Sequence, residues 1–294
     1  MSSINNIFLL ATFGLAALPL SAAFPTRSGL TVLKGRQIES YNGCSDDQKK
    51  KLEQDFADAA SFANYAVASL TTDKNAYQNY LRDEDWDHVQ NMWSAIELNN
   101  TPDDSNHEGT GYKFSVTCAA EDDSQCKDRT TESFAITDAQ PQDGDTAREM
   151  KICAKYFSDP LTKRSTTDKV YKPHPGRRDN SWCTPDGYKL ADFMVGGVTL
   201  LHEMTHLDIV GVRADYPEIH DDDDNFDFHG TRDIDDLDPQ NNPPAQARAL
   251  KALWRDGKNV EGTVEPYLSA ENIAASAFEW YVVDRCEYSD DMPV

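Results

Sequence analysis

The sequence is poor in positive charge. It holds 28 Lys and Arg against 51 Asp and Glu in 294 residues, a formal net charge of −23. Nucleic-acid backbones bind clusters of Lys and Arg, so nucleic acid is not an expected partner. We interpret the acidity mainly as a means of keeping an extracellular protein soluble, although basic peptides and cations would also be attracted to it.

Long apolar runs are absent except near the start of the chain. That run extends from Ile7 to Leu20, is preceded by no Lys or Arg, and is followed by the small residues Ser21, Ala22 and Ala23. It is shorter than the roughly 20 residues that span a bilayer. It predicts a signal peptide over residues 1–23, hence a secreted, extracellular chain without membrane association after cleavage.

The sequence contains no Cys-x-x-Cys spacing, which disfavours a zinc site built from cysteines. Its six cysteines, an even number, all lie beyond the predicted signal peptide, at Cys44, Cys118, Cys126, Cys153, Cys183 and Cys286. An exported chain with such a set is expected to form three disulfides. The cysteine count alone leaves fifteen pairings open.

No internal repeat is visible, and we expect residues 44–294 to form one domain after a leader or short pro-segment over 24–43. The hydrophobic pattern predicts an α+β fold that is mainly α-helical, with a small antiparallel sheet. Residues 215–244 are acidic and predict a loop. The predicted helices cover 45–70, 86–98, 190–207, 245–256 and 270–285, and the extended segments cover 112–118 and 150–156.

The segment His202-Glu203-Met204-Thr205-His206 carries the clearest chemical pattern. Two histidines four residues apart lie on one face of a helix, as joint metal ligation requires. Glu203 beside them could act as general base on a metal-bound water. Because the helix is apolar and the chain exported, we favour metal binding over two histidines on an ordinary surface helix.

A catalytic zinc site needs a third protein ligand. No His follows at the spacing of the extended His-Glu-x-x-His-x-x-Gly-x-x-His motif. Asp233, in His229-Gly230-Thr231-Arg232-Asp233, is the best candidate. Glu271 and Glu279 on a later helix are further possibilities, and His229 could line the cleft or replace Asp233.

These residues resemble a known family, the aspzincins, which include the deuterolysins and the peptidyl-Lys metalloendopeptidases. The family pattern is His-Glu-x-x-His followed by Gly-Thr-x-Asp-x-x-Tyr-Gly. Here His202, Glu203 and His206 match the first part, and Gly230-Thr231-x-Asp233 matches the start of the second. Asp236-Leu237 stands in place of the terminal Tyr-Gly, and 233 − 206 = 27 residues separate His206 from Asp233.

The resemblance implies a zincin-like fold with one Zn²⁺ per chain, held by His202, His206 and Asp233, and Glu203 as catalytic base. It also implies the pairs Cys44–Cys118, Cys126–Cys153 and Cys183–Cys286. The last predicted helix resembles the family's closing helix. There Glu279 matches one of two carboxylates that receive the substrate lysine in lysine-specific members, whereas Ser276 occupies the other position.

The expected function is therefore that of a secreted zinc metalloendopeptidase, a hydrolase acting on protein or peptide substrates. The alternative is a secreted, non-catalytic zinc-binding protein or surface antigen that keeps the zincin fold. The missing Tyr-Gly favours the alternative, and the presence of Glu203 favours the peptidase. For the oxyanion donor, Tyr216, Tyr267 and Tyr281 are equal candidates.

Overall fold

The computed structural model describes residues 38–97, 113–127, 133–141, 148–167, 182–183, 189–221, 225–234, 237–238, 242–288 and 292–294. These residues form a mixed α and β unit in which helix predominates. The predicted signal peptide lies outside the described residues. Residues 38–42, within the predicted leader, form a strand of the main sheet, so the folded unit includes residues before 44.

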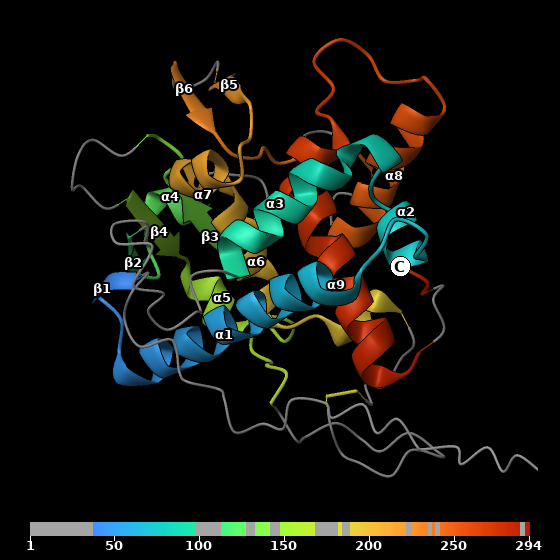
Figure 1. Ribbon diagram of the computed structural model, residues 1–294. Helices are drawn as coiled ribbons and strands as arrows, with labels where there is room; N and C mark the ends of the chain where they lie inside the picture. The colour runs from blue at the N-terminus through green and yellow to red at the C-terminus, as the bar shows by residue number, and fades with distance from the viewer. Residues whose placement is uncertain are drawn as a thin grey trace, which may run out of the picture. The chain divides into compact units, whose positions relative to one another are not determined.

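Helices and strands are interspersed along the chain (Figure 1). The strands are β1 (Ile38–Asn42), β2 (Phe114–Cys118), β3 (Ala135–Thr137), β4 (Arg148–Ile152), β5 (Glu218–Asp221) and β6 (Phe226–His229). The α-helices are α1 (Asp46–Ser69), α2 (Asn75–Gln78), α3 (Trp86–Glu97), α4 (Ser124–Lys127), α5 (Ala154–Ser158), α6 (Gly196–His206), α7 (Asp208–Arg213), α8 (Pro243–Arg255) and α9 (Ala270–Cys286). Short 3-10 turns lie at η1 (Asp83–Asp85), η3 (Leu190–Phe193) and η4 (Pro266–Leu268).

The main sheet is mixed, which corrects the predicted antiparallel sheet. Its strand order is β1-β2-β4-β3; β1 and β4 both run parallel to β2, and only β3 is antiparallel to its neighbour β4. The chain between β1 and β2 includes α1, α2 and α3, long enough to return to the same end of the sheet. Alternating apolar residues predict a strand but not the direction of its neighbour, which is why the sequence did not predict this arrangement.

Helix α6 lies at the centre of the unit, in contact with α1, α3, α7, α9 and β3 (Figure 1). The long helix α1 begins as its sequence predicts, because Ser45 caps it and Gln48 completes a capping box. The core includes fully buried aromatic side chains such as Phe62 of α1 and Phe278 of α9, whose ring centroids are 5.2 Å apart. The helix that carries the histidines is thus held on several sides by packed helices.

The segment predicted as one helix over 190–207 is divided. Residues Leu190–Phe193 form a 3-10 turn, and α6 begins only at Gly196 after extended residues. A Cβ on Gly197 would lie 2.6 Å from Asp58 Cβ of α1, so the glycine pair permits a close approach of α1 and α6. Two glycines also weaken helix propensity, which favours a break at this point.

Two other segments differ from prediction. The acidic region 215–244 contains the hairpin β5–β6, in which Ile219 pairs with Phe228 and Phe228 is buried. The two strands are only four residues each, and the acidic residues between and around them masked their pattern. The extended segment predicted over 150–156 ends at Ile152, after which α5 begins at Ala154.

Three disulfides link Cys44 with Cys118, Cys126 with Cys153, and Cys183 with Cys286, which confirms the predicted pairs. They close loops of 74, 27 and 103 residues and so restrict the unfolded chain. Three such bonds indicate that the protein folds in an oxidising, extracellular type of environment. Within the described ranges, every helix is too short or too polar to cross a membrane.

Candidate metal centre

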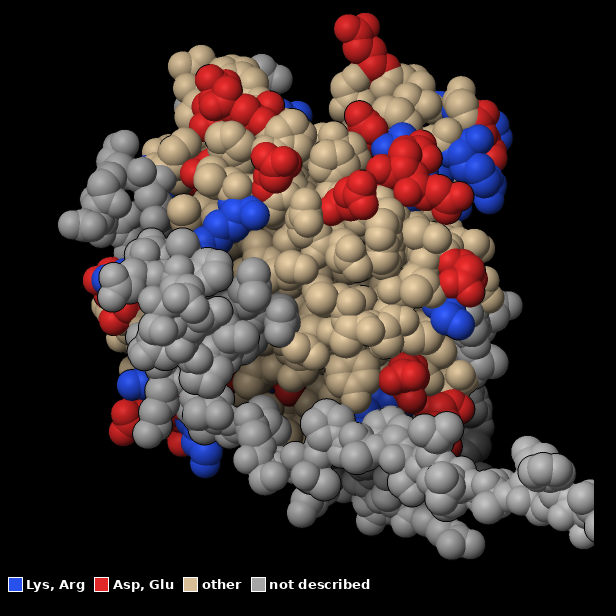
Figure 2. Space-filling model, viewed as in Figure 1, with Lys and Arg blue, Asp and Glu red and all other residues tan. Residues whose placement is uncertain are grey.

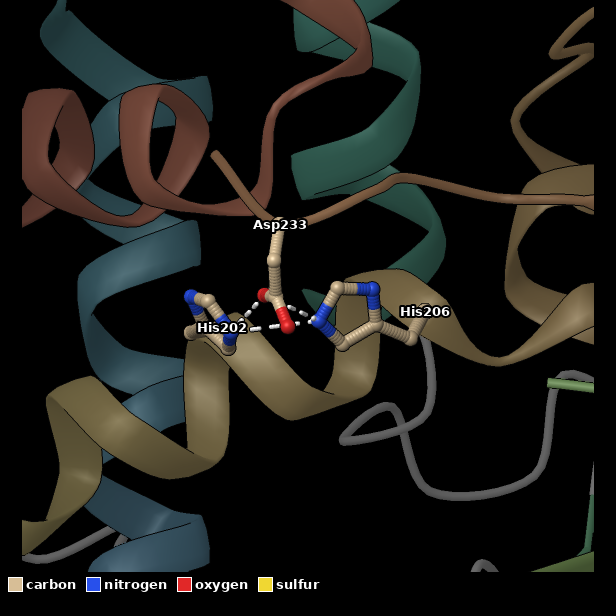
Figure 3. Close-up of side chains that lie close together, drawn as sticks. All are labelled: His202, His206 and Asp233. Atoms are coloured by element: carbon tan, nitrogen blue, oxygen red, sulfur yellow. Dashed lines mark hydrogen bonds and ion pairs between the residues drawn. The ribbon is translucent and has the colours of Figure 1, made fainter. Parts of the chain in front are cut away.

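The two motif histidines lie on one face of α6, as their spacing predicts. The Nε2 atoms of His202 and His206 are 3.1 Å apart and point toward the same position (Figure 3). Asp233 reaches them from the segment after β6, with its Oδ1 2.9 Å from His202 Nε2 and 3.2 Å from His206 Nε2. The fold therefore brings together the three residues that the sequence proposed as ligands.

The spacing of these three atoms fits joint coordination of one metal ion. Tetrahedral coordination with bonds of about 2.0–2.1 Å places ligand atoms about 3.3–3.4 Å apart. The observed separations of 2.9, 3.1 and 3.2 Å are close to this expected distance between ligand atoms. Two imidazoles and a carboxylate are also a common donor set for borderline transition metals.

The segment carrying Asp233 is attached on one side to α6. The amide of Thr231 donates to the carbonyl of Thr205 over 3.2 Å, and the two threonine hydroxyls lie 2.7 Å apart in a buried contact. The Thr231 carbonyl lies 2.8 Å from Nδ1 of His206. This bond assigns the ring proton to Nδ1, since a carbonyl only accepts, and leaves Nε2 available for a metal ion.

On its other side the same segment is attached to α9. Arg232 forms a β-bridge with Ser269, the residue that caps α9. The amide of Ile234 donates to Oε1 of buried Glu271 over 3.3 Å, and Gln246 of α8 donates to the Ile234 carbonyl over 3.0 Å. Asp233 is thus held between two fixed residues, which keeps its carboxylate opposite α6.

The electrostatics of the three side chains are those of a site suited to a cation. Burial favours neutral imidazole, but the hydrogen bond and negative charge of Asp233 outweigh it and raise the pKa of His202 to about 10. The pKa of His206 is raised for the same reason. Burial opposes ionisation of Asp233, yet the two imidazoles hold its pKa well below the usual range. A bound cation would replace the protons that these histidines otherwise hold.

Glu203, next in sequence to His202 on α6, contacts strand β3 through its side chain. Its side chain is buried, with 7% exposed, and its Oε2 accepts a hydrogen bond of 2.7 Å from the Thr137 hydroxyl. Thr137 lies 66 residues upstream of Glu203 and outside any motif, so no local pattern predicts this contact. Thr205 occupies one of the two variable positions of the histidine motif, so the motif does not predict its contact with Thr231 either.

The other candidate ligands lie apart from this group. His229 pairs with Asp208 at the start of α7, with its Nδ1 3.2 Å from the carboxylate. Glu271 supports the backbone of Ile234 rather than joining the three ligand atoms. Among the described residues, the metal-ligand group consists of His202, His206 and Asp233.

Glu279 is fully buried in a polar network away from the histidines. Its carboxylate accepts hydrogen bonds from Arg248 over 2.6 Å, from Tyr80 over 2.5 Å and from Asn79 over 2.9 Å. The network joins α8 and α9 to Asn79 and Tyr80, which follow α2, and Arg248 also donates to the carbonyl of Met292 near the end of the chain. A substrate role for Glu279 stays a prediction, and its observed contacts are those of a residue that stabilises the fold.

The three tyrosines considered as oxyanion donors differ in position. The hydroxyl of buried Tyr216 donates to the carbonyl of Tyr267 over 3.0 Å. The Tyr267 ring stacks on the His88 ring, with ring centroids 4.5 Å apart. Tyr281 packs against Phe62 in the core. None of these contacts places a hydroxyl against the three ligands.

Most of the face in Figure 2 is formed by residues other than Lys, Arg, Asp and Glu. Asp and Glu gather over the β5–β6 hairpin and near α8, and a group of Lys and Arg lies beside them near α8. The distribution agrees with the formal charge of −23. Neither a protein-family model nor a curated protein matches the chain, so the assignment of the site depends on its own residues and geometry.

Proposed function

We propose that this chain is a secreted zinc-dependent endopeptidase of the aspzincin type, with a zincin-like fold. The proposal rests chiefly on one observation: His202, His206 and Asp233 converge on one position while Glu203, next in sequence to His202, lies buried beside them. Three protein ligands leave a fourth position for water or substrate, as in catalytic zinc sites. Purely structural zinc sites use four protein ligands.

Zinc held by these three residues would supply a Lewis acid for the scissile carbonyl and would activate water at neutral pH. Glu203 would accept the proton of the attacking water and deliver it to the leaving amine. Its Oε2 is engaged by Thr137, so Oε1 is the oxygen that would carry the proton. The His206 ring is held by the Thr231 carbonyl, and Asp233 is held by the backbone contacts of its neighbours Arg232 and Ile234.

The sheet supports a peptide as substrate. Strand β3 is at the end of the strand order β1-β2-β4-β3 and contacts α6, and its last residue, Thr137, contacts Glu203. An extended peptide can add to such an edge through main-chain hydrogen bonds. That mode of binding recognises the backbone that an endopeptidase must cleave.

The test compares the purified chain with Glu203→Gln, measuring zinc content and hydrolysis of an unfolded protein substrate. We expect one zinc per chain in both proteins and cleavage by the parent alone, because glutamine cannot take up the proton. Glu218→Gln, which removes an exposed carboxylate from β5, is the matched control and should cleave like the parent.

Zinc in both proteins without cleavage by either would support the alternative of a secreted zinc-binding protein. Absence of zinc from the parent would contradict both functions. Equal cleavage by parent and Glu203→Gln would contradict the role of Glu203.

A further inference from the structure

Thr137 is the last residue of β3, at the edge of the main sheet that faces α6. Its backbone is fixed, because Thr137 pairs with Met150 of β4 and the next residue, Asp138, donates from its amide to the Glu149 carbonyl over 2.9 Å. A β-branched side chain in a strand has few χ1 rotamers. The Thr137 hydroxyl therefore has a defined position relative to the sheet.

That hydroxyl is directed at the carboxylate of Glu203. Its Oγ1 lies 2.7 Å from Glu203 Oε2 and 3.3 Å from the Glu203 carbonyl oxygen. A hydroxyl has one proton to donate, and an ionised carboxylate can only accept. The shorter distance and the negative charge both favour donation to Oε2, and hydrogen bonds to charged groups are the stronger class.

Among the side chains that the structure describes, the Thr137 hydroxyl is the donor that binds the Glu203 carboxylate. Glu203 is buried, with 7% exposed, so an unsatisfied carboxylate oxygen would be costly there. The side chain has three rotatable bonds, and the helix fixes none beyond its Cα–Cβ direction. The bond from Thr137 restrains the carboxylate, with Oε2 toward β3 and Oε1 left for another partner.

We propose that Thr137 is the positioning residue for Glu203: its hydroxyl holds the carboxylate in the orientation in which Oε1 accepts a proton. The proposal rests on the proposed function, in which Glu203 is the general base. It adds a link between the sheet edge and the catalytic helix, so the strand beside which a peptide would bind also orients the base.

A merely structural role is the competing explanation, in which Thr137 only satisfies a buried acceptor. Loss of the hydroxyl would then lower stability without a specific effect on turnover. Positioning predicts instead a loss in kcat while KM and zinc content stay constant, because the substrate and metal contacts remain. Measurement of kcat and KM therefore distinguishes the two explanations.

The kinetic experiment compares Thr137→Val, Thr137→Ser and Thr117→Val with the parent on a peptide substrate. Valine keeps the branched shape and removes the donor, whereas serine keeps the donor. Thr117 provides a matched loss of a half-buried hydroxyl from β2 of the same sheet. We expect Thr137→Val to lower kcat about 10- to 100-fold with KM changed less than about twofold, and Thr137→Ser to recover most of kcat. Parent-like kcat in Thr137→Val would overturn the proposal.

A second measurement keeps this test separate from that of the proposed function. Crystal structures of the zinc-loaded parent and Thr137→Val report the orientation of Glu203 whether or not the protein cleaves peptides. We expect one ordered carboxylate orientation in the parent and a rotated or disordered carboxylate in the variant. An unchanged Glu203 in the variant contradicts positioning, whereas an inactive parent with an ordered Glu203 contradicts only the peptidase assignment.

Discussion

The two ends of α6 both face aspartates, but they use them in opposite ways. At the N-terminal end, Asp55 of α1 is fully buried and accepts hydrogen bonds from Lys51 over 2.6 Å and from Tyr156 over 2.6 Å. At the C-terminal end, Asp233 keeps 45% of its side chain exposed and faces His202 and His206. Side-chain donors of the protein bind the Asp55 carboxylate. The Asp233 carboxylate instead lies beside the ring nitrogens of two imidazoles.

The pKa values shift in opposite directions at the two ends. Burial raises the pKa of Asp55 to about 7, although Lys51 and Tyr156 counteract it. The adjacent imidazoles instead hold the pKa of Asp233 well below its usual range despite desolvation. Asp55, which is bound by donors of the protein, thus links parts of the fold. Asp233, which lies beside two imidazole nitrogens, forms a group that attracts a cation.

Among substitutions at the two ends of α6, we expect the largest effect on metal binding. Asp233→Asn removes the negative charge and weakens the oxygen ligand, so we expect at least about a 100-fold loss of zinc affinity. Asp55→Asn, the matched change at the other end of α6, should bind zinc like the parent. A competition titration against a chromophoric chelator measures both, and parent-like affinity in Asp233→Asn would exclude it as a ligand.

The next effect is on stability at the N-terminal end. In Gly196→Ala the new Cβ would collide with the Tyr156 hydroxyl and lie 2.5 Å from Asp55 Oδ2 and 2.7 Å from the Thr162 carbonyl. We expect the free energy of unfolding to fall by about 1–3 kcal/mol, as for overpacked cores. Urea denaturation checks this, with Val260→Ala, at an exposed position, as control. A variant as stable as the parent would show that α1 and α6 can separate at no cost.

The third expected effect is a change in the pH dependence of stability. Asp55 has a pKa of about 7 in the folded chain against an ordinary 3.8, so the folded state binds its proton more readily than the unfolded state. Its contribution to the free energy of unfolding therefore decreases as pH rises from about 4 to 7. Asp55→Asn should remove this decrease. Denaturant titrations of both proteins across that range provide the slope, and equal slopes would contradict the raised pKa.

Local patterns predicted the elements whose signals lie within a few residues. Ser45 and Ser269 cap the helices that their neighbours predicted, and the four-residue spacing of His202 and His206 placed both rings on one face. The resemblance to aspzincins supplied Asp233 and the cysteine pairs, both of which the structure brings together. Here the information was either local or carried by a short motif.

Predictions failed where contacts between distant segments decide the outcome. The direction of β4 depends on where β3 packs, and the start of α6 depends on the approach of α1 at Gly196 and Gly197. The partners of Glu279 were likewise beyond local patterns: Arg248 and Tyr80, far along the chain, donate to its carboxylate, while its substrate role stays a prediction. Such partners cannot be recognised from spacing along one helix.

The sequence by itself determined the chemistry available: a helix with two imidazoles and a carboxylate in fixed register, cysteines that can pair, and a strongly acidic surface. Tertiary structure alone decided how Asp233 is brought to the two imidazoles and which hydroxyl contacts Glu203. The physical reason is the distance along the chain over which each interaction acts. Helical register acts over four residues through backbone hydrogen bonds, whereas Asp233 and Thr137 reach α6 only after the hairpin and the sheet have packed around it.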